Sequence, residues 1–122
     1  MSENEQLEQY RQSLIEIASE TWRFRRVFGR IIGNMDSTQK DKYMSQYMWF
    51  DKRVQSALEK AGLRIENVEG QMFDVGMSVT PINIDDFDPD EPLLVVQMVE
   101  PIIMDSMGLV KSGTVLLGRV EQ

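Results

Sequence analysis

Residues 7–35 read LEQYRQSLIEIASETWRFRRVFGRIIGNM, and their spacing decides the fold. Apolar residues recur there at alternating intervals of three and four positions, and only Thr21 interrupts the series. The series is Leu7, Tyr10, Leu14, Ile17, Thr21, Phe24, Phe28, Ile31 and Met35. A narrow repeat of this kind is typical of a coiled-coil seam, and it predicts one long helix over about Glu3–Gly33.

The predicted helix is too long to be covered by the rest of this short chain. At about 1.5 Å per residue it spans about 45 Å. A second copy of the same helix is the simplest cover, so we expect a homodimer. The residues expected to form its interface are Leu14, Ile17, Phe24, Phe28 and Ile31. The alternative cover is the next helix of the same chain, folded back as a hairpin.

A second helix is expected over about 38–61. Asp36 or Ser37 can cap its first turn, and Gly62 can end it in the left-handed conformation. Its apolar positions form a broad stripe, which suits a helix that touches more than one neighbour. They are Tyr43, Met44, Tyr47, Met48, Phe50, Val54, Ala57, Leu58 and Ala61. Because the connection at 33–36 is short, the two helices should form a hairpin.

The chain changes character near Gly62. Eight of the ten aromatic residues lie between positions 10 and 50, and all four prolines lie beyond position 80. Short apolar stretches punctuated by glycine follow, which predicts four to six strands. The expected fold class is therefore α+β. We expect a helical dimerisation region at 1–62 and a small, mostly β domain for partner binding at 63–122.

Two sets of buried residues are expected. Trp22 and Trp49 lie partly off the seams and are assigned to the helical core. The β core is expected to contain Leu63, Ile65, Val79, Leu94, Val96, Met98, Val115, Leu117 and Val120. Tight turns are expected at 107–108 and 112–113, where glycine follows methionine or serine.

The composition removes several classes of chemistry. The chain has no cysteine and no histidine, which excludes disulfides, thiolate metal sites, cysteine nucleophiles and the serine–histidine triad. No glycine-rich phosphate loop occurs. We therefore expect no enzyme activity and no cofactor. No apolar run approaches the roughly 20 residues that cross a bilayer, and the first nine residues are too polar for a signal peptide, so a cytoplasmic protein without membrane contact is expected.

One acidic run suggests a metal site. Asp86, Asp88 and Asp90 have the spacing that opens a calcium-binding loop. Glu91 then stands where such a loop needs glycine, and Gln97 stands where it needs a bidentate glutamate. We therefore expect a solvated loop and no metal.

Charge is unevenly distributed along the chain. The net charge is -1 over residues 1–36, +2 over 37–62 and -8 over 63–122. The acidic C-terminal part should repel nucleic-acid phosphates and anionic lipids, so we expect a protein partner with a basic surface and no nucleic acid. Solubility alone is the simpler explanation of the acidic surplus.

Four segments of the sequence resemble the GrpE family. Residues 58–63, LEKAGL, resemble the family's leucine–lysine–x–glycine start of the first strand, and residues 68–74, VEGQMFD, resemble its glycine–x–x–phenylalanine–aspartate segment. Residues 31–36 are similar to its helix junction without the proline. Residues 109–115 stand where the family has a basic turn before its last strand.

The resemblance implies a fold and a function. GrpE proteins are homodimeric nucleotide-exchange cochaperones, in which the β-domain binds a DnaK-like ATPase and favours an open cleft from which ADP leaves. The partner-binding residues expected here are Met104, Met107, Leu109 and Lys111, because methionines at an exposed turn make an adaptable contact surface. The alternative is a non-catalytic dimeric adaptor that docks a partner through its β-domain without affecting nucleotide.

Overall fold

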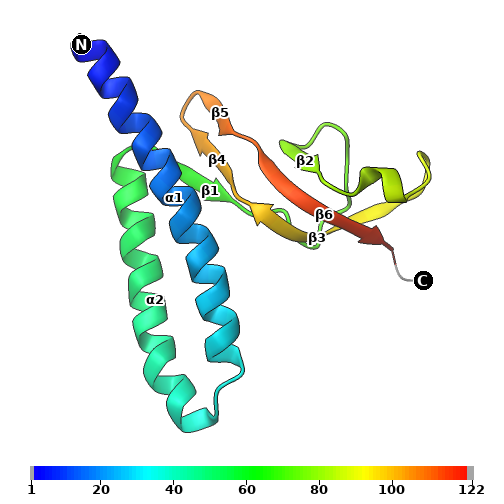
Figure 1. The fold of residues 1–122 in the computed structure, drawn as a ribbon, viewed down its shortest axis with the longest axis horizontal. Coiled ribbons are helices and arrows are strands. Elements are labelled where there is room, and N and C mark those ends of the chain that lie inside the picture. Colours follow the sequence, from blue (N-terminus) through cyan, green and yellow to red (C-terminus); the bar gives the residue numbers. More distant parts are fainter. Residues whose placement is uncertain (1, 121–122) are drawn as a thin grey trace. The chain divides into compact units, whose positions relative to one another are not determined.

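The computed structural model describes residues 2–120 and shows an α+β fold, as the sequence predicts (Figure 1). Within this described range, two long helices come first, and six short strands in two three-stranded sheets follow. The chain divides into two compact units, Met1–Ala61 and Gly62–Gln122. Each unit is described by itself below, as the helical unit and the β unit.

Helix α1 spans Glu3–Gly33, the range predicted from the seam. Ser2 caps its start, and the Ser2 hydroxyl accepts a hydrogen bond from the backbone N–H of Glu5 at 3.2 Å. Acidic Glu3 and Glu5 lie in the first turn and Arg30 lies in the last, which complements the helix dipole at both ends. Local signals at both termini therefore explain why this helix begins and ends where predicted.

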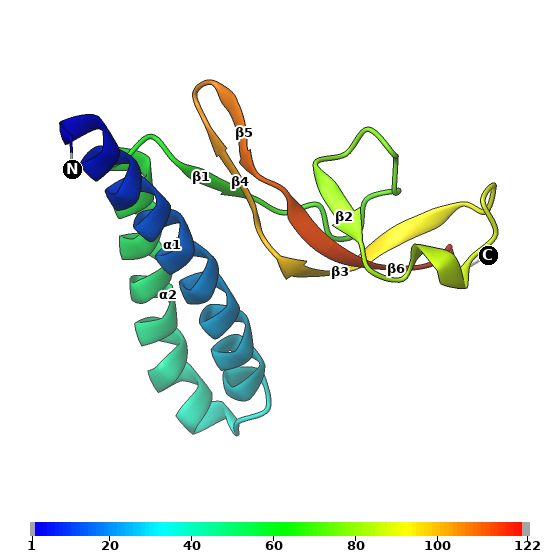
Figure 2. The same cartoon turned by 45° about the horizontal axis from the view of Figure 1, so that its top comes forward.

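Helix α2 spans Ser37–Lys60 and runs back along α1, as Figures 1 and 2 show. The Asp36 carboxylate accepts from the backbone N–H of Gln39 at 3.0 Å and caps the first turn. Gly62 follows the helix with φ of +76°, the left-handed conformation expected of a helix stop. The hairpin within one chain is thus present.

The buried face of α1 lies beside the predicted seam. Ile15, Ala18 and Trp22 are buried at the three- and four-residue spacing of one helix face, and Leu58 is buried on α2. Trp22 is a core residue, as predicted. Because few residues of α2 are buried, a large part of the apolar surface of the helical unit stays in contact with solvent.

In the described part of the β unit, residues 62–120, six strands form two sheets. One sheet has the order β1-β4-β5 and is antiparallel throughout, and the other has the order β2-β6-β3 with β6 parallel to β2 and antiparallel to β3. The strands are β1 (Arg64–Glu66), β2 (Val79–Pro81), β3 (Leu93–Glu100), β4 (Ile102–Asp105), β5 (Gly108–Lys111) and β6 (Gly113–Arg119). A 3₁₀ turn, η1, spans Ile84–Asp86. Six strands agree with the four to six expected.

The chain crosses between the two sheets at two short connections, one between β3 and β4 and one between β5 and β6. The apolar stretch at 93–103 is divided by buried Pro101, because proline has no N–H for a strand ladder. Ser112 alone separates β5 from β6. The backbone of residues 70–73 covers the outer edge of β3, where the N–H of Gly70 donates to the carbonyl of Val95 at 2.8 Å.

The prediction of which residues of β3 are buried is wrong in the first half of the strand, where the opposite set of alternate residues forms the core. Leu93 and Val95 are buried, whereas Leu94 is half-buried and Val96 is exposed. Residues 93–96 are all aliphatic, so the sequence shows no alternation of apolar and polar residues that would indicate which side of β3 is buried. A register shift after Val95 returns Met98 to the buried side. Leu63, Val115 and Leu117 are buried as predicted, and Ile65, Val79 and Val120 are half-buried.

Candidate functional site

A row of apolar side chains on α1 is open to solvent. Tyr10, Ile17, Phe24 and Ile31 follow one another at intervals of seven residues, and each is 51–63% exposed in the single chain. We call these four residues the heptad stripe. Since the seven-residue repeat keeps them on one side of a long helix, they form an uncovered face over most of α1.

The other half of the predicted seam is partly covered. Leu14 and Phe28 are half-buried. The Phe28 ring lies 6.0 Å from the Phe24 ring in a stacked arrangement and 6.4 Å from the Tyr47 ring of α2. Of the five residues expected at the dimer interface, Ile17, Phe24 and Ile31 are therefore exposed, Leu14 and Phe28 are half-buried, and Phe28 contacts Tyr47 of α2.

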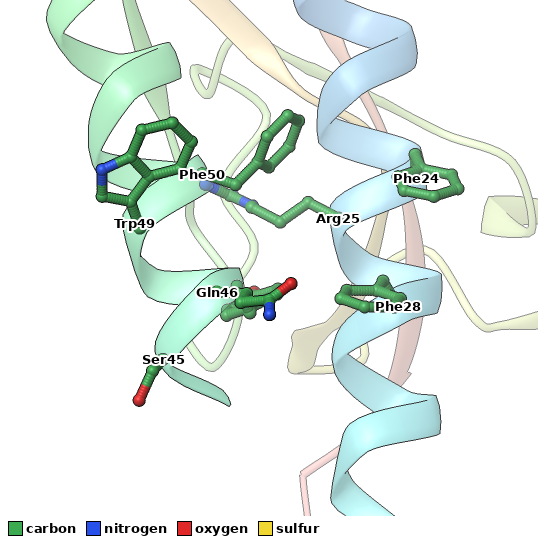
Figure 3. A pocket seen from close by; sticks show the side chains of 8 residues that line it. Phe24, Arg25, Phe28, Ser45, Gln46, Trp49 and Phe50 are labelled. Carbon is green, nitrogen blue, oxygen red and sulfur yellow. The ribbon is translucent and has the colours of Figure 1, made fainter. Parts of the chain in front are cut away.

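An open aromatic groove lies between α1 and α2 beside the stripe. Its volume is about 540 Å³. It is lined by Phe24, Arg25, Phe28, Ser45, Gln46, Tyr47, Trp49 and Phe50. Figure 3 shows Arg25 reaching from α1 towards α2, where its guanidinium forms an ion pair with Asp51. Phe24 belongs to both the groove and the heptad stripe, so the two features are continuous.

The prediction that Trp49 is a core residue is wrong. It is 65% exposed, and the guanidinium of Arg53 lies 5.5 Å from the centre of its ring. Tyr47 is the α2 residue that contacts Phe28, and a residue two positions further lies about 200° around the helix. Trp49 therefore cannot share that contact and remains at the rim of the groove.

Charge changes sign along α1. Residues 3–20 carry five glutamates and one arginine, and residues 21–33 carry four arginines and no acidic residue. The two halves thus have net charges of -4 and +4. Sequence reasoning missed this feature because it counted residues 1–36 as one block, in which the two halves nearly cancel.

The predicted partner-binding residues all lie on the β4–β5 hairpin. Met107 is at its tip and is 92% exposed, Leu109 is exposed, and Met104 is half-buried opposite Leu109. The amine of Lys111 lies 3.5 Å from the Glu100 carboxylate and is therefore engaged within the β unit. The structure brings these four residues together on one element.

Local bonds fix the shape of the hairpin tip. The Asp105 carboxylate accepts from the backbone N–H of Met107 at 2.8 Å. Gly108 has φ of +126°, which a residue with a side chain rarely adopts. The hydrogen bond to Asp105 and the positive φ of Gly108 therefore fix the turn that exposes Met107.

The acidic run shows intrachain contacts. Arg119 forms an ion pair with Glu91 at 2.5 Å, and its guanidinium lies 5.1 Å from the centre of the Phe87 ring. Among residues 2–120, no group of three or more acidic side chains is arranged to hold a metal ion. Within the same described range, no helix has the length and apolar character of a membrane span.

No known protein family, curated protein or solved structure matches the chain.

Proposed function

We propose that this chain is a GrpE-like cochaperone: a homodimer that binds a DnaK-like ATPase in the cytoplasm and promotes ADP release without chemistry of its own. One observation carries the proposal. A helical hairpin with an uncovered heptad stripe is joined to a separate β unit that presents an exposed apolar hairpin tip. The resemblance of residues 58–63 and 68–74 to GrpE segments supports the same function.

The β4–β5 hairpin is the proposed contact with the ATPase. Met107 and Leu109 give an apolar centre, and methionine adapts its shape to a partner surface. A cluster of this kind at the centre of an interface commonly supplies most of the binding energy. The acidic β unit, with net charge -8 over residues 63–122, would speed encounter with a basic ATPase surface.

The mechanism needs only a difference in affinity. A factor that binds the open state of the ATPase more tightly than the closed state by about 3 kcal/mol shifts the equilibrium about a hundredfold. ADP then leaves from the open cleft. By thermodynamic linkage, ADP must weaken binding of this chain by the same factor by which this chain weakens binding of ADP.

Binding to a purified DnaK-like ATPase from the same host tests the proposal. The chain should bind the nucleotide-free ATPase at least tenfold more tightly than the ADP-bound ATPase. Met107→Asp with Leu109→Asp should abolish binding. Val75→Asp is the matched control, because Val75 is equally exposed at 92% in the same unit and lies outside the hairpin. Equal affinity for the two ATPase states would leave the adaptor function, and no binding would remove the ATPase as partner.

A further inference from the structure

The β4–β5 hairpin carries a thioether sulfur at its tip, the turn that joins the two strands in Figure 1. Met107 is 92% exposed, a value that only Val75 equals among the large apolar residues that the structure describes. The chain has nine methionines and no cysteine, so thioethers are its only sulfur groups. A two-electron oxidant of sulfur, such as hydrogen peroxide, can therefore act on this chain only at methionine.

The other described methionines are better shielded from an oxidant in solution. Met48 is 63% exposed and Met72 is 52% exposed, and both lie outside the hairpin. Met98 is buried, and its sulfur accepts a hydrogen bond from the backbone N–H of Val68 at 3.4 Å. The half-buried methionines are Met35, Met44, Met77 and Met104. Because the oxidant must reach the sulfur, the order of exposure predicts that Met107 reacts first.

We propose that Met107 is a site of reversible oxidation by peroxides, and that its sulfoxide weakens the contact between the β4–β5 hairpin and the ATPase. The inference rests on the proposed function and adds a redox sensitivity to the same surface. In the forward step one oxygen atom passes from hydrogen peroxide to the sulfur. The O–O bond breaks, the S–O bond forms, and the second oxygen leaves as water, so the sulfur is oxidised by two electrons and the peroxide is reduced.

The reverse step uses thiols, because sulfoxide reductases return methionine sulfoxide to methionine. Two thiol groups supply two electrons and two protons, and they are oxidised to a disulfide. The S–O bond breaks and its oxygen leaves as water. Each of the two sulfoxide epimers needs its own reductase. The exposed tip gives these enzymes the same access to Met107 that it gives the oxidant.

Oxidation changes the chemistry of the proposed contact without disturbing the turn. The turn is fixed by the hydrogen bond from the Met107 N–H to the Asp105 carboxylate and by the positive φ of Gly108, and neither involves the sulfur. The sulfoxide oxygen is a hydrogen-bond acceptor, and its burial against an apolar surface without a donor is unfavourable. The apolar centre that Met107 forms with Leu109 is therefore lost while the hairpin stays folded.

Peroxide treatment of the full-length chain, followed by peptide mass spectrometry, tests the site without the ATPase. Met107 should gain one oxygen faster than Met48 and Met72, and about tenfold faster than buried Met98. Circular dichroism and the melting temperature should not change while Met107 alone is oxidised. Oxidation of Met48 or Met72 before Met107 would overturn the assignment of the site, whatever the chain binds.

Binding of the treated chain to the nucleotide-free ATPase tests the effect, with the peroxide removed before mixing. The chain oxidised at Met107 should bind about tenfold more weakly, and both sulfoxide reductases with dithiothreitol should restore its affinity. Met107→Leu has no sulfur at the tip, so peroxide should change the affinity of this variant less than about twofold. The matched variants Met48→Leu and Met72→Leu should lose as much affinity on treatment as the unaltered chain.

The outcomes separate this inference from the proposed function. Unchanged affinity of a chain oxidised at Met107 would overturn the redox sensitivity and leave the proposed function in place. Equal loss of affinity by the peroxide-treated Met107→Leu variant would also overturn it, because another residue would then carry the effect. Absence of binding by the untreated chain would overturn the proposed function, and the redox sensitivity of that contact with it.

Discussion

The side-chain amide of Asn83 exchanges two hydrogen bonds with the backbone of Leu117. Its Nδ2 donates to the Leu117 carbonyl at 2.9 Å, and its Oδ1 accepts from the Leu117 N–H at 2.9 Å. Asn83 lies just after β2, beside β6. Its side chain makes the two hydrogen bonds to β6 that the backbone of one more β2 residue would otherwise make. This contact extends β6 pairing beyond the end of a three-residue strand.

Asn83→Ala should destabilise the β unit by about 1–3 kcal/mol, because it leaves two backbone groups of β6 without their partners. Urea unfolding of the full chain, followed by circular dichroism, measures the loss. Gln71→Ala, at an exposed position of the same unit, should change the free energy of unfolding by less than about 0.5 kcal/mol. Equal effects of the two substitutions would show that the bridge to Leu117 contributes no stability.

Gly113→Ala should also destabilise the β unit, by about 1–3 kcal/mol. An added Cβ at this buried position would lie 2.8 Å from a side-chain carbon of Ile102 and 3.0 Å from the Glu100 carbonyl oxygen. Gly33→Ala is the control, since an added Cβ there meets nothing within 4 Å. Thermal unfolding of both variants compares them, and a neutral Gly113→Ala would contradict the close packing at the start of β6.

Ile17→Asp with Phe24→Asp should weaken dimerisation at least a hundredfold while helix content is retained. Both side chains are exposed in the single chain, so the change removes an intermolecular contact, and burial of each is worth about 1.5–3 kcal/mol. Analytical ultracentrifugation and circular dichroism measure mass and helicity. Met48→Asp, at an exposed α2 position outside the groove lining, should leave the dimer intact.

Association with the ATPase should slow as salt rises, and dissociation should change little. The acidic β unit steers encounter over a distance that salt screens, whereas the apolar contact at Met107 and Leu109 holds the complex. Surface plasmon resonance between 50 and 500 mM salt separates the two rates. A dissociation rate that rises as steeply as the association rate falls would place charge at the centre of the interface.

Local sequence signals predicted the helices well. The ends of α2 were predicted from Asp36 and Gly62, whose capping roles depend only on neighbouring residues, whereas the Ser2 cap of α1 was not predicted. The seam was also visible, and the structure leaves its Tyr10, Ile17, Phe24 and Ile31 positions open. The heptad pattern therefore predicted an apolar helix face that stays exposed in the single chain, but it did not identify the packing partner of that face.

The β unit was less predictable because its decisive features are not local. The phase of β3 depends on a register shift against β6, and no residue between Leu93 and Val96 signals it. The assignment of β5 and β6 to different sheets across Ser112 depends on their distant partners. For the candidate site, a methionine at a glycine turn was enough to predict the exposed tip, whereas the exposure of Trp49 required the geometry of the hairpin.

The release rate of a fluorescent ADP analogue from the cognate DnaK-like ATPase tests the central claim most directly. Stopped-flow traces with and without this chain should show release accelerated at least tenfold, with no acceleration by the Met107→Asp/Leu109→Asp variant and full acceleration by Val75→Asp. An unchanged release rate at concentrations that saturate binding would contradict the exchange function.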